Sequence, residues 1–137
     1  MNDNLIFMGV NAPRVHQAAI TKLIYGLTDL YVKKESDLFA YPETMIDESQ
    51  TSPAPDVMLI DPKTDLTKVI IEITHTQGVK KDIQKLLELM RDYEVPEGFV
   101  FDYKLNIWHK FPSNSETGGI NSSWCDAVGR ELSGLLF

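Results

Sequence analysis

Two short apolar runs lie near the middle of the chain: Pro55-Asp56-Val57-Met58-Leu59-Ile60-Asp61-Pro62 and, after a short polar connection, Val69-Ile70-Ile71-Glu72-Ile73. Both apolar runs are short and bounded by turn-forming residues, which predicts strands at 56–60 and 69–73 joined by a turn. The second run is apolar apart from Glu72, a pattern typical of a strand that is covered on both faces in the middle of a sheet. The fold is therefore expected to form around these two strands.

Helices are predicted before and after these strands. Apolar residues recur at spacings of three and four over residues 12–34 and again over residues 79–93, which predicts two amphipathic helices. The other expected elements are an irregular strand at 38–46 that Pro42 pushes toward a sheet edge, a loop at 47–55, a hairpin of strands at 99–103 and 105–109, a polar loop at 112–122 and a closing helix at 124–137. This order of elements predicts an α/β layer arrangement.

Length and composition are those of a globular protein. The 137 residues, 43% of them hydrophobic and 24% charged, fit a single domain spanning 1–137 and exclude a disordered chain. No apolar run approaches the ~20 residues that span a bilayer. The N-terminal stretch lacks the features of a signal peptide, so no membrane association and a cytoplasmic location are expected. The single cysteine, Cys125, cannot form an internal disulfide bond, which agrees with that location.

Two classes of function are disfavoured by the charged and metal-ligating residues. With 13 basic and 20 acidic residues the formal net charge is −7, whereas a protein that relies on nonspecific attraction to phosphates is usually basic. The three histidines and the single cysteine are scattered, without the paired spacing of a zinc site, which excludes that class.

Each of the two central strands carries a carboxylate. Asp56 opens one strand, and Glu72 lies inside the other, 16 positions later. A carboxylate among Val and Ile side chains is costly to bury without a partner, and two like charges at ~4 Å repel by roughly 4 kcal/mol at an effective dielectric constant of 20. A proton on one of them, or a divalent cation such as Mg²⁺ between them in an open hollow, would relieve that repulsion. The alternatives are that Glu72 reaches the sheet edge or pairs with a lysine, and that Asp56 belongs to a turn.

Four further stretches accompany these strands: His16-Gln17 near the start of the first helix, Lys81-Asp82 leading the second, Gly98-Phe99-Val100-Phe101-Asp102-Tyr103, and Ser133-Gly134-Leu135 near the end. In this order and spacing the chain resembles the PD-(D/E)XK nuclease superfamily, and within it the Uma-two-like group of restriction-endonuclease-like proteins. The resemblance implies a restriction-endonuclease-like α/β fold, with a central mixed sheet flanked by helices. It also implies an endonuclease that uses Mg²⁺ or Mn²⁺ to hydrolyse phosphodiester bonds in DNA.

The resemblance extends to individual residues. The metal-binding carboxylates of the superfamily fall on Asp56 and Glu72 of this chain. The lysine of the superfamily normally lies two positions beyond the second carboxylate. This chain has Thr74 there, and a threonine cannot supply the positive charge of a lysine.

In the Uma-two-like group the following helix supplies the lysine instead. Aligned without gaps, its position falls on Leu86, so the adjacent Lys85 is the first substitute, and Lys81, one turn earlier on the same side, is the second. Such a lysine would stabilise the charge that develops on the phosphate or hold the attacking water. The ordinary alternative for both lysines is a solvated helix face beside Asp82 and Glu88.

Other polar residues are weaker candidates for the same site. His75 and Gln77 follow the second strand at its turn into the helix, where His75 would bind phosphate or transfer a proton, or be a plain loop histidine. Glu43 is a candidate for an additional acidic residue near the metal. His16 lies where other superfamily members place a glutamate, and its alternative is a histidine on the helix surface.

DNA is the expected partner despite the acidic balance of the chain. Basic residues of the second helix, Lys80, Lys81, Lys85 and Arg91, would form the contacting face, and a homodimer would present two half-sites. The main alternative is a catalytically inactive protein that keeps the nuclease fold and acts as a binding or assembly module. Thr74 and the acidic charge favour that alternative. A third option is another phosphoester substrate, such as RNA.

Overall fold

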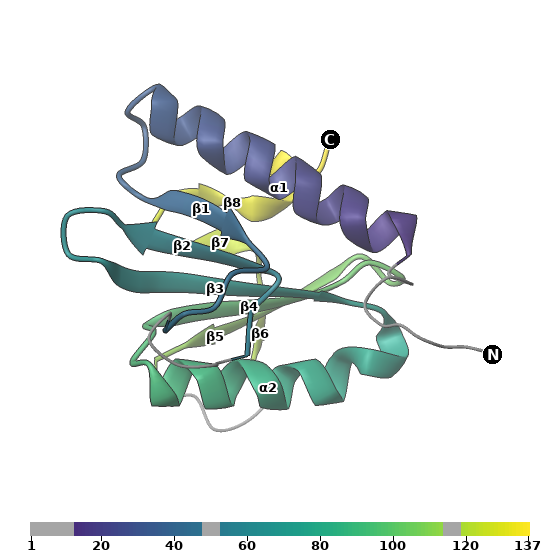
Figure 1. Ribbon diagram of the computed structural model, residues 1–137. Helices are drawn as coiled ribbons and strands as arrows, with labels where there is room; N and C mark the ends of the chain where they lie inside the picture. The colour runs from purple at the N-terminus through teal and green to yellow at the C-terminus, as the bar shows by residue number, and fades with distance from the viewer. Residues whose placement is uncertain (1–12, 48–52, 114–118) are drawn as a thin grey trace.

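Helices α1 and α2 cover opposite faces of a mixed six-stranded sheet (Figure 1). The computed structural model describes residues 13–47, 53–113 and 119–137. In chain order its elements are α1 (Arg14–Val32), β1 (Phe39–Pro42), β2 (Val57–Asp61), β3 (Leu66–Thr74), the 3₁₀ helix η3 (Thr76–Gly78), α2 (Val79–Asp92), β4 (Glu97–Asp102), β5 (Ile107–Pro112), β6 (Ile120–Asn121), β7 (Trp124–Cys125), β8 (Arg130–Glu131) and the 3₁₀ helix η4 (Leu132–Leu135). The predicted α/β architecture, a central mixed sheet flanked by helices, is confirmed.

The sheet has the strand order β1-β2-β3-β4-β5-β6. Neighbouring strands are antiparallel except β3 and β4, which run parallel and are joined by a crossover through α2. The register pairs Val57 of β2 with Ile71 of β3. Asp56 precedes Val57 and Glu72 follows Ile71, so this register brings the two carboxylates to neighbouring positions of adjacent chain segments.

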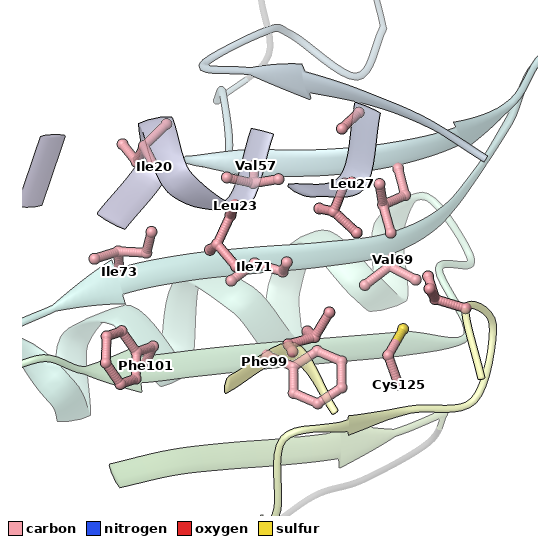
Figure 2. Close-up of a cluster of buried hydrophobic side chains, with 14 of the residues drawn as sticks. Ile20, Leu23, Leu27, Val57, Val69, Ile71, Ile73, Phe99, Phe101 and Cys125 are labelled. Carbon is pink, nitrogen blue, oxygen red and sulfur yellow. The ribbon is translucent and has the colours of Figure 1, made fainter. Parts of the chain in front are cut away.

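The larger core lies between the sheet and α1 (Figure 2). Val69, Ile71 and Ile73 of β3 belong to this core together with Leu23 of α1, and none of the four is more than 2% exposed. Because side chains alternate between the two faces along a strand, the intervening residues of β3 face α2. Glu72 is one of them.

A second core lies between the sheet and α2. Leu86, Leu89 and Met90 of α2 pack there with Ile70 of β3. At Gly98 of β4, a Cβ atom would lie only 2.5 Å from the Met90 sulfur, so the absence of a side chain lets α2 approach the sheet closely. The close packing holds α2 in place directly above the face of β3 that carries Glu72.

The closing helix predicted at 124–137 is wrong. The chain there forms the hairpin of β7 and β8 and then the short helix η4. Gly129 adopts φ +76°, which ends any right-handed helix at that point. The backbone N–H groups of Asp126 and Ala127 donate hydrogen bonds to the Glu97 side chain at 2.7 and 3.1 Å instead of to helix carbonyls. A distant glutamate therefore decides the local structure.

The other boundaries differ from the prediction by a few residues. The first strand ends at Pro42 because Glu43 adopts φ 43°, and residues 44–47 form no strand. β4 begins two residues before the predicted position and β5 begins two residues after it. β6 occupies part of the polar loop expected at 112–122.

Some predicted features lie outside the described residues, namely the helix start at Ala12 and the loop segments at 48–52 and 114–118. Among the residues that the structure describes, neither helix has the length and apolar character needed to cross a bilayer.

Candidate active site

Asp56 and Glu72 meet where β2 begins and β3 approaches its end. The backbone N–H of Ile73 donates a hydrogen bond to Oδ2 of Asp56 at 2.8 Å. The backbone N–H of Asp56 in turn lies 3.4 Å from Oε1 of Glu72 and donates to it. Each carboxylate is therefore tied to the strand that carries the other. The structure brings the two residues together, as their positions on neighbouring strands predict.

Glu72 is buried and short of hydrogen-bond donors. The residue is 1% exposed, and its Oε2 accepts no hydrogen bond from the described part of the chain. Burial, and after it the neighbouring charge of Asp56, raise the pKa of Glu72 to about 8 against the opposing effect of Lys85. A carboxyl group with this pKa carries its proton at neutral pH as long as no added cation is present.

Lys85 is the lysine that reaches the carboxylates. Its Nζ lies 3.4 Å from Oε2 and 3.5 Å from Oε1 of Glu72, and it also donates to the carbonyl oxygen of Ala54 at 3.2 Å. Leu86, at the ungapped family position, is fully buried in the α2 core. Lys81 is exposed and forms no hydrogen bond or ion pair within the described residues, so the first substitute, not the second, lies at the site.

His16, one of the additional candidates from the sequence, also belongs to this site. Its Nε2 lies 3.3 Å from Oδ2 of Asp56, and both side chains are 17% exposed. The bond to Asp56 raises the pKa of His16 although burial lowers it. Burial alone would raise the pKa of Asp56, but its hydrogen bonds with His16 and the Ile73 N–H outweigh that effect and lower it. Both shifts favour the charged forms, a protonated His16 beside an ionised Asp56.

The charges of the two carboxylates are balanced by groups on different helices. The negative charge of Asp56 is balanced from the α1 side by His16, whereas Glu72 is balanced from the α2 side by Lys85 or by a proton. Asp82 of α2 adds a smaller effect that raises the pKa of Glu72. A further positive charge at this point would therefore stabilise Glu72 as the anion.

The remaining candidates lie around the site without entering it. Thr74 is buried, and its hydroxyl donates to the carbonyl oxygen of His75 at 3.2 Å. The side chains of His75 and Gln77 are exposed, and the ring of His75 packs edge-on against Tyr103. Neither contacts the two carboxylates in the described structure.

Glu43 lies next to Asp56 through its backbone. Its N–H donates to the carbonyl oxygen of Asp56 at 3.0 Å, and its side chain is exposed. Its charge contributes to the raised pKa of His16. The acidic residue expected from the first strand is therefore close to the site, although it is not a member of the carboxylate pair.

The donor set fits a magnesium-type cation. In the described residues each carboxylate has one oxygen that accepts backbone hydrogen bonds, Oδ2 of Asp56 and Oε1 of Glu72, and one oxygen that accepts none. Mg²⁺ is commonly held by one or two carboxylates, with waters and substrate phosphate completing its shell. No group of three or more His, Cys, Asp or Glu side chains suited to a metal occurs in the described ranges, which disfavours an all-protein cage.

The open hollow expected around both carboxylates is a prediction that the structure corrects. The Glu72 side chain is only 2% exposed, and Lys85, which lies against it, also donates to the carbonyl oxygen of Ala54. Asp56 and Lys85, whose side chains are 17% and 36% exposed, are the solvent-accessible members of the site, and Glu72 is buried.

Comparison with known proteins finds a solved structure with a similar fold. No protein-family model matches the chain, and no curated protein matches its sequence. Among solved structures, the chain is similar to a protein of Anabaena variabilis ATCC 29413 described as a "putative nuclease belonging to DUF820". The superposition covers 91% of this chain and 82% of that chain with a TM-score of 0.68 at 12% sequence identity. At this identity the likeness establishes a shared fold, and this α/β sheet architecture is therefore one that occurs in a described nuclease candidate.

Proposed function

We propose that this protein is a metal-dependent endonuclease that hydrolyses phosphodiester bonds in DNA. The observation that carries the proposal is the convergence of Asp56, Glu72 and Lys85 at one point, with a buried Glu72 oxygen that accepts no hydrogen bond in the described structure. The fold shared with a described nuclease candidate supports the same conclusion. Fold alone does not decide function, so the argument rests on the site.

Asp56 and Glu72 would hold Mg²⁺ or Mn²⁺ through the oxygens that accept no hydrogen bond from the described residues, Oδ1 and Oε2, and Lys85 lies 3.4 Å from the second of these. When bound, the metal would supply a Lewis acid for the phosphate oxygens and lower the pKa of a coordinated water. Glu72 must lose its proton to bind, and because its pKa is raised this loss becomes easy only as the pH approaches 8. The backbone hydrogen bonds to both carboxylates keep the two residues in place whether or not a cation is present.

Lys85 would supply the positive charge at the scissile phosphate. Its ammonium group is held at 3.2–3.5 Å by a carbonyl oxygen and by Glu72, and its side chain is 36% exposed. An ammonium group on a flexible stem can turn from a carboxylate to a phosphate oxygen without moving the backbone. In this role Lys85 stabilises negative charge that develops during hydrolysis.

The surface of α2 offers a route for the DNA backbone. Lys80 and Lys81 are exposed on the same helix as Lys85, and Arg91 is exposed near its end. Lysine and arginine contacts of this kind bind phosphates without reading sequence. A homodimer would present this face to two half-sites.

A catalytically inactive nuclease fold that acts as a binding or assembly module is the second candidate function. Two observations favour it: Thr74 occupies the usual lysine position, and Glu72 is covered and inclined to keep its proton. In that protein the Lys85–Glu72 contact would be a permanent structural contact that joins α2 to β3.

Cleavage of supercoiled plasmid in Mg²⁺ or Mn²⁺ separates the two candidates. Wild-type protein is expected to nick the plasmid, and Asp56→Asn, Glu72→Gln and Lys85→Met are each expected to lower the rate by about 100-fold or more. Lys63→Met alters an exposed lysine in the turn between β2 and β3, outside the proposed contacting face, and as the control it should retain most of the activity. Cleavage that survives Asp56→Asn and Glu72→Gln would indicate contamination, and an inactive wild type would favour the binding module.

Calorimetric titration with Mn²⁺ tests the metal directly. The wild type is expected to bind one ion per chain, and the Asp56→Asn, Glu72→Gln double variant is expected to bind none. The same cleavage assay with single-stranded RNA separates the third option from the first. If wild type shows no binding of Mn²⁺ at pH 8, close to the raised pKa of Glu72, the proposed metal mechanism is wrong.

A further inference from the structure

Asp56 is held at one oxygen by two donors from opposite directions. The Ile73 N–H reaches Oδ2 from β3 at 2.8 Å, and His16 Nε2 reaches the same atom from α1 at 3.3 Å. No hydrogen bond from the described residues reaches Oδ1. Because the terminal torsion of an aspartate side chain has a broad energy minimum, one donor alone leaves the carboxylate free to rotate about that bond. The second donor removes this freedom.

The fold fixes His16 where it can provide that donor. His16 lies in the first turn of α1, and the helix is anchored to the sheet by fully or nearly fully buried residues such as Ile20, Leu23 and Leu27. The imidazole is 17% exposed, and its Nδ1 is buried without a hydrogen-bond partner among the described residues. A ring enclosed in this way has few other places to turn, so its contact with Asp56 is not that of a mobile surface histidine.

We propose that His16 is a positioning residue, which holds the Asp56 carboxylate by Oδ2 so that Oδ1 stays directed to the divalent cation and away from the backbone of β3. The inference rests on the proposed function, because it assigns His16 a purpose in metal binding. Donors that orient a ligating carboxylate commonly contribute 10- to 100-fold to metal affinity. His16 itself contacts neither Glu72 nor Lys85 in the described structure, so it acts through Asp56.

The test compares His16→Ala and His16→Gln with the control His109→Gln. A glutamine amide can place its nitrogen near the position of Nε2 and restore the donor, whereas alanine cannot. His109 is a half-buried histidine of β5 outside the site and receives the same chemical change. All variants are first compared with wild type by thermal unfolding, so that a loss of folding is recognised.

The first measurement needs no metal. The backbone amide of Ile73 donates to the oxygen that His16 holds, so its ¹H and ¹⁵N resonances report the position of the Asp56 carboxylate. His16 also lies against the Ile73 backbone, so the decisive comparison is between two variants that both lack the imidazole. His16→Ala is expected to shift this amide further from the wild-type position than His16→Gln, and His109→Gln should leave it unchanged. If the Ile73 amide is unchanged in a folded His16→Ala protein, the inference is overturned, whatever the metal does.

The second measurement is the Mn²⁺ dissociation constant. His16→Ala is expected to raise it by about 10-fold or more, and His16→Gln should recover most of the wild-type affinity. Equal affinity of wild type and His16→Ala would contradict the inference while leaving the metal site intact. If wild type binds no Mn²⁺, the proposed function and this role in metal binding are both wrong, and the Ile73 amide shift then shows only whether His16 holds Asp56 structurally.

Discussion

Two buried glutamates, Glu72 and Glu97, lie on neighbouring parallel strands and differ in how many close hydrogen-bond donors surround them. Glu97 at the start of β4 accepts hydrogen bonds from the N–H groups of Asp126 and Ala127 at 2.7 and 3.1 Å, and Lys110 lies 3.2 Å from its Oε2. Glu72 on β3 receives only contacts of 3.4–3.5 Å, and its Oε2 accepts no hydrogen bond from the described residues.

The difference separates a structural carboxylate from a candidate functional one. Glu97 is surrounded by short donors and joins the β7–β8 hairpin to the sheet. A buried polar group with all its partners stabilises one structure, whereas one that lacks donors is costly and needs a reason to be there. For Glu72 the reason that we propose is a cation. Four measurements test this difference between Glu72 and Glu97.

The largest effect is expected for the pH dependence of Glu72. Its pKa is 4.5 in an ordinary setting and about 8 in the folded protein. Between these values the folded state keeps a proton that the unfolded state has lost, so the stability of wild type falls as pH rises through this range. Glu72→Gln cannot lose a proton there. Its free energy of unfolding, relative to wild type, should increase by up to about 5 kcal/mol between pH 4 and pH 9.

Urea unfolding of both proteins in metal-free buffer at a series of pH values measures this difference. Other titrating groups are common to both proteins and cancel to a first approximation. If the difference in unfolding free energy between the two proteins stays constant with pH, then Glu72 does not lack donors and the contrast with Glu97 is wrong.

Glu97→Gln should cost about 3 kcal/mol of unfolding free energy at neutral pH. The substitution leaves the ammonium of Lys110, whose side chain is 10% exposed, with the exposed Asp126 as its one charged partner among the described residues. The measurement is urea unfolding followed by tryptophan fluorescence. Adding Lys110→Met should recover part of the loss, since the buried charge is then removed. A loss below about 1 kcal/mol in the single variant would mean that Glu97 is dispensable.

Mn²⁺ affinity should rise with pH until Glu72 is ionised. Because the cation must displace one proton from a group with a pKa of about 8, the association constant is expected to increase about tenfold between pH 6 and pH 7 and to level off above pH 8. Calorimetry in buffers of different ionisation enthalpy also counts the released proton. An affinity that does not change from pH 6 to pH 8 would show that Glu72 does not bind the ion.

The smallest effect is expected at an exposed ion pair. Arg130 of β8 lies 3.2 Å from Glu35, and both side chains are about half exposed, at 45% and 51%. Arg130→Ala should therefore change the unfolding free energy by no more than about 0.5 kcal/mol. This variant is the control for Glu97→Gln, since both alter attachments of the same hairpin. A cost as large as that of Glu97→Gln would mean that burial is not what distinguishes these pairs.

Local sequence patterns were sufficient for most of the secondary structure. The helix spacing of apolar residues marked α1 and α2, and the apolar run around Glu72 marked the central strand, because these patterns record which face each element buries. The last predicted helix failed because Glu97, about thirty positions away along the chain, binds the amides of Asp126 and Ala127. No local pattern contains that contact.

The candidate site, like the fold, was predictable from the sequence only in part. From the sequence alone, Asp56 and Glu72 were assigned to successive strands joined by a short turn, and the antiparallel register of β2 and β3 then brings them together. Only the tertiary structure decided that Lys85 rather than Lys81 reaches Glu72, that His16 reaches Asp56, and that the pair is covered. Those outcomes depend on how each helix is rotated and placed on the sheet, which the packing of both cores sets and which spacing along the chain does not contain.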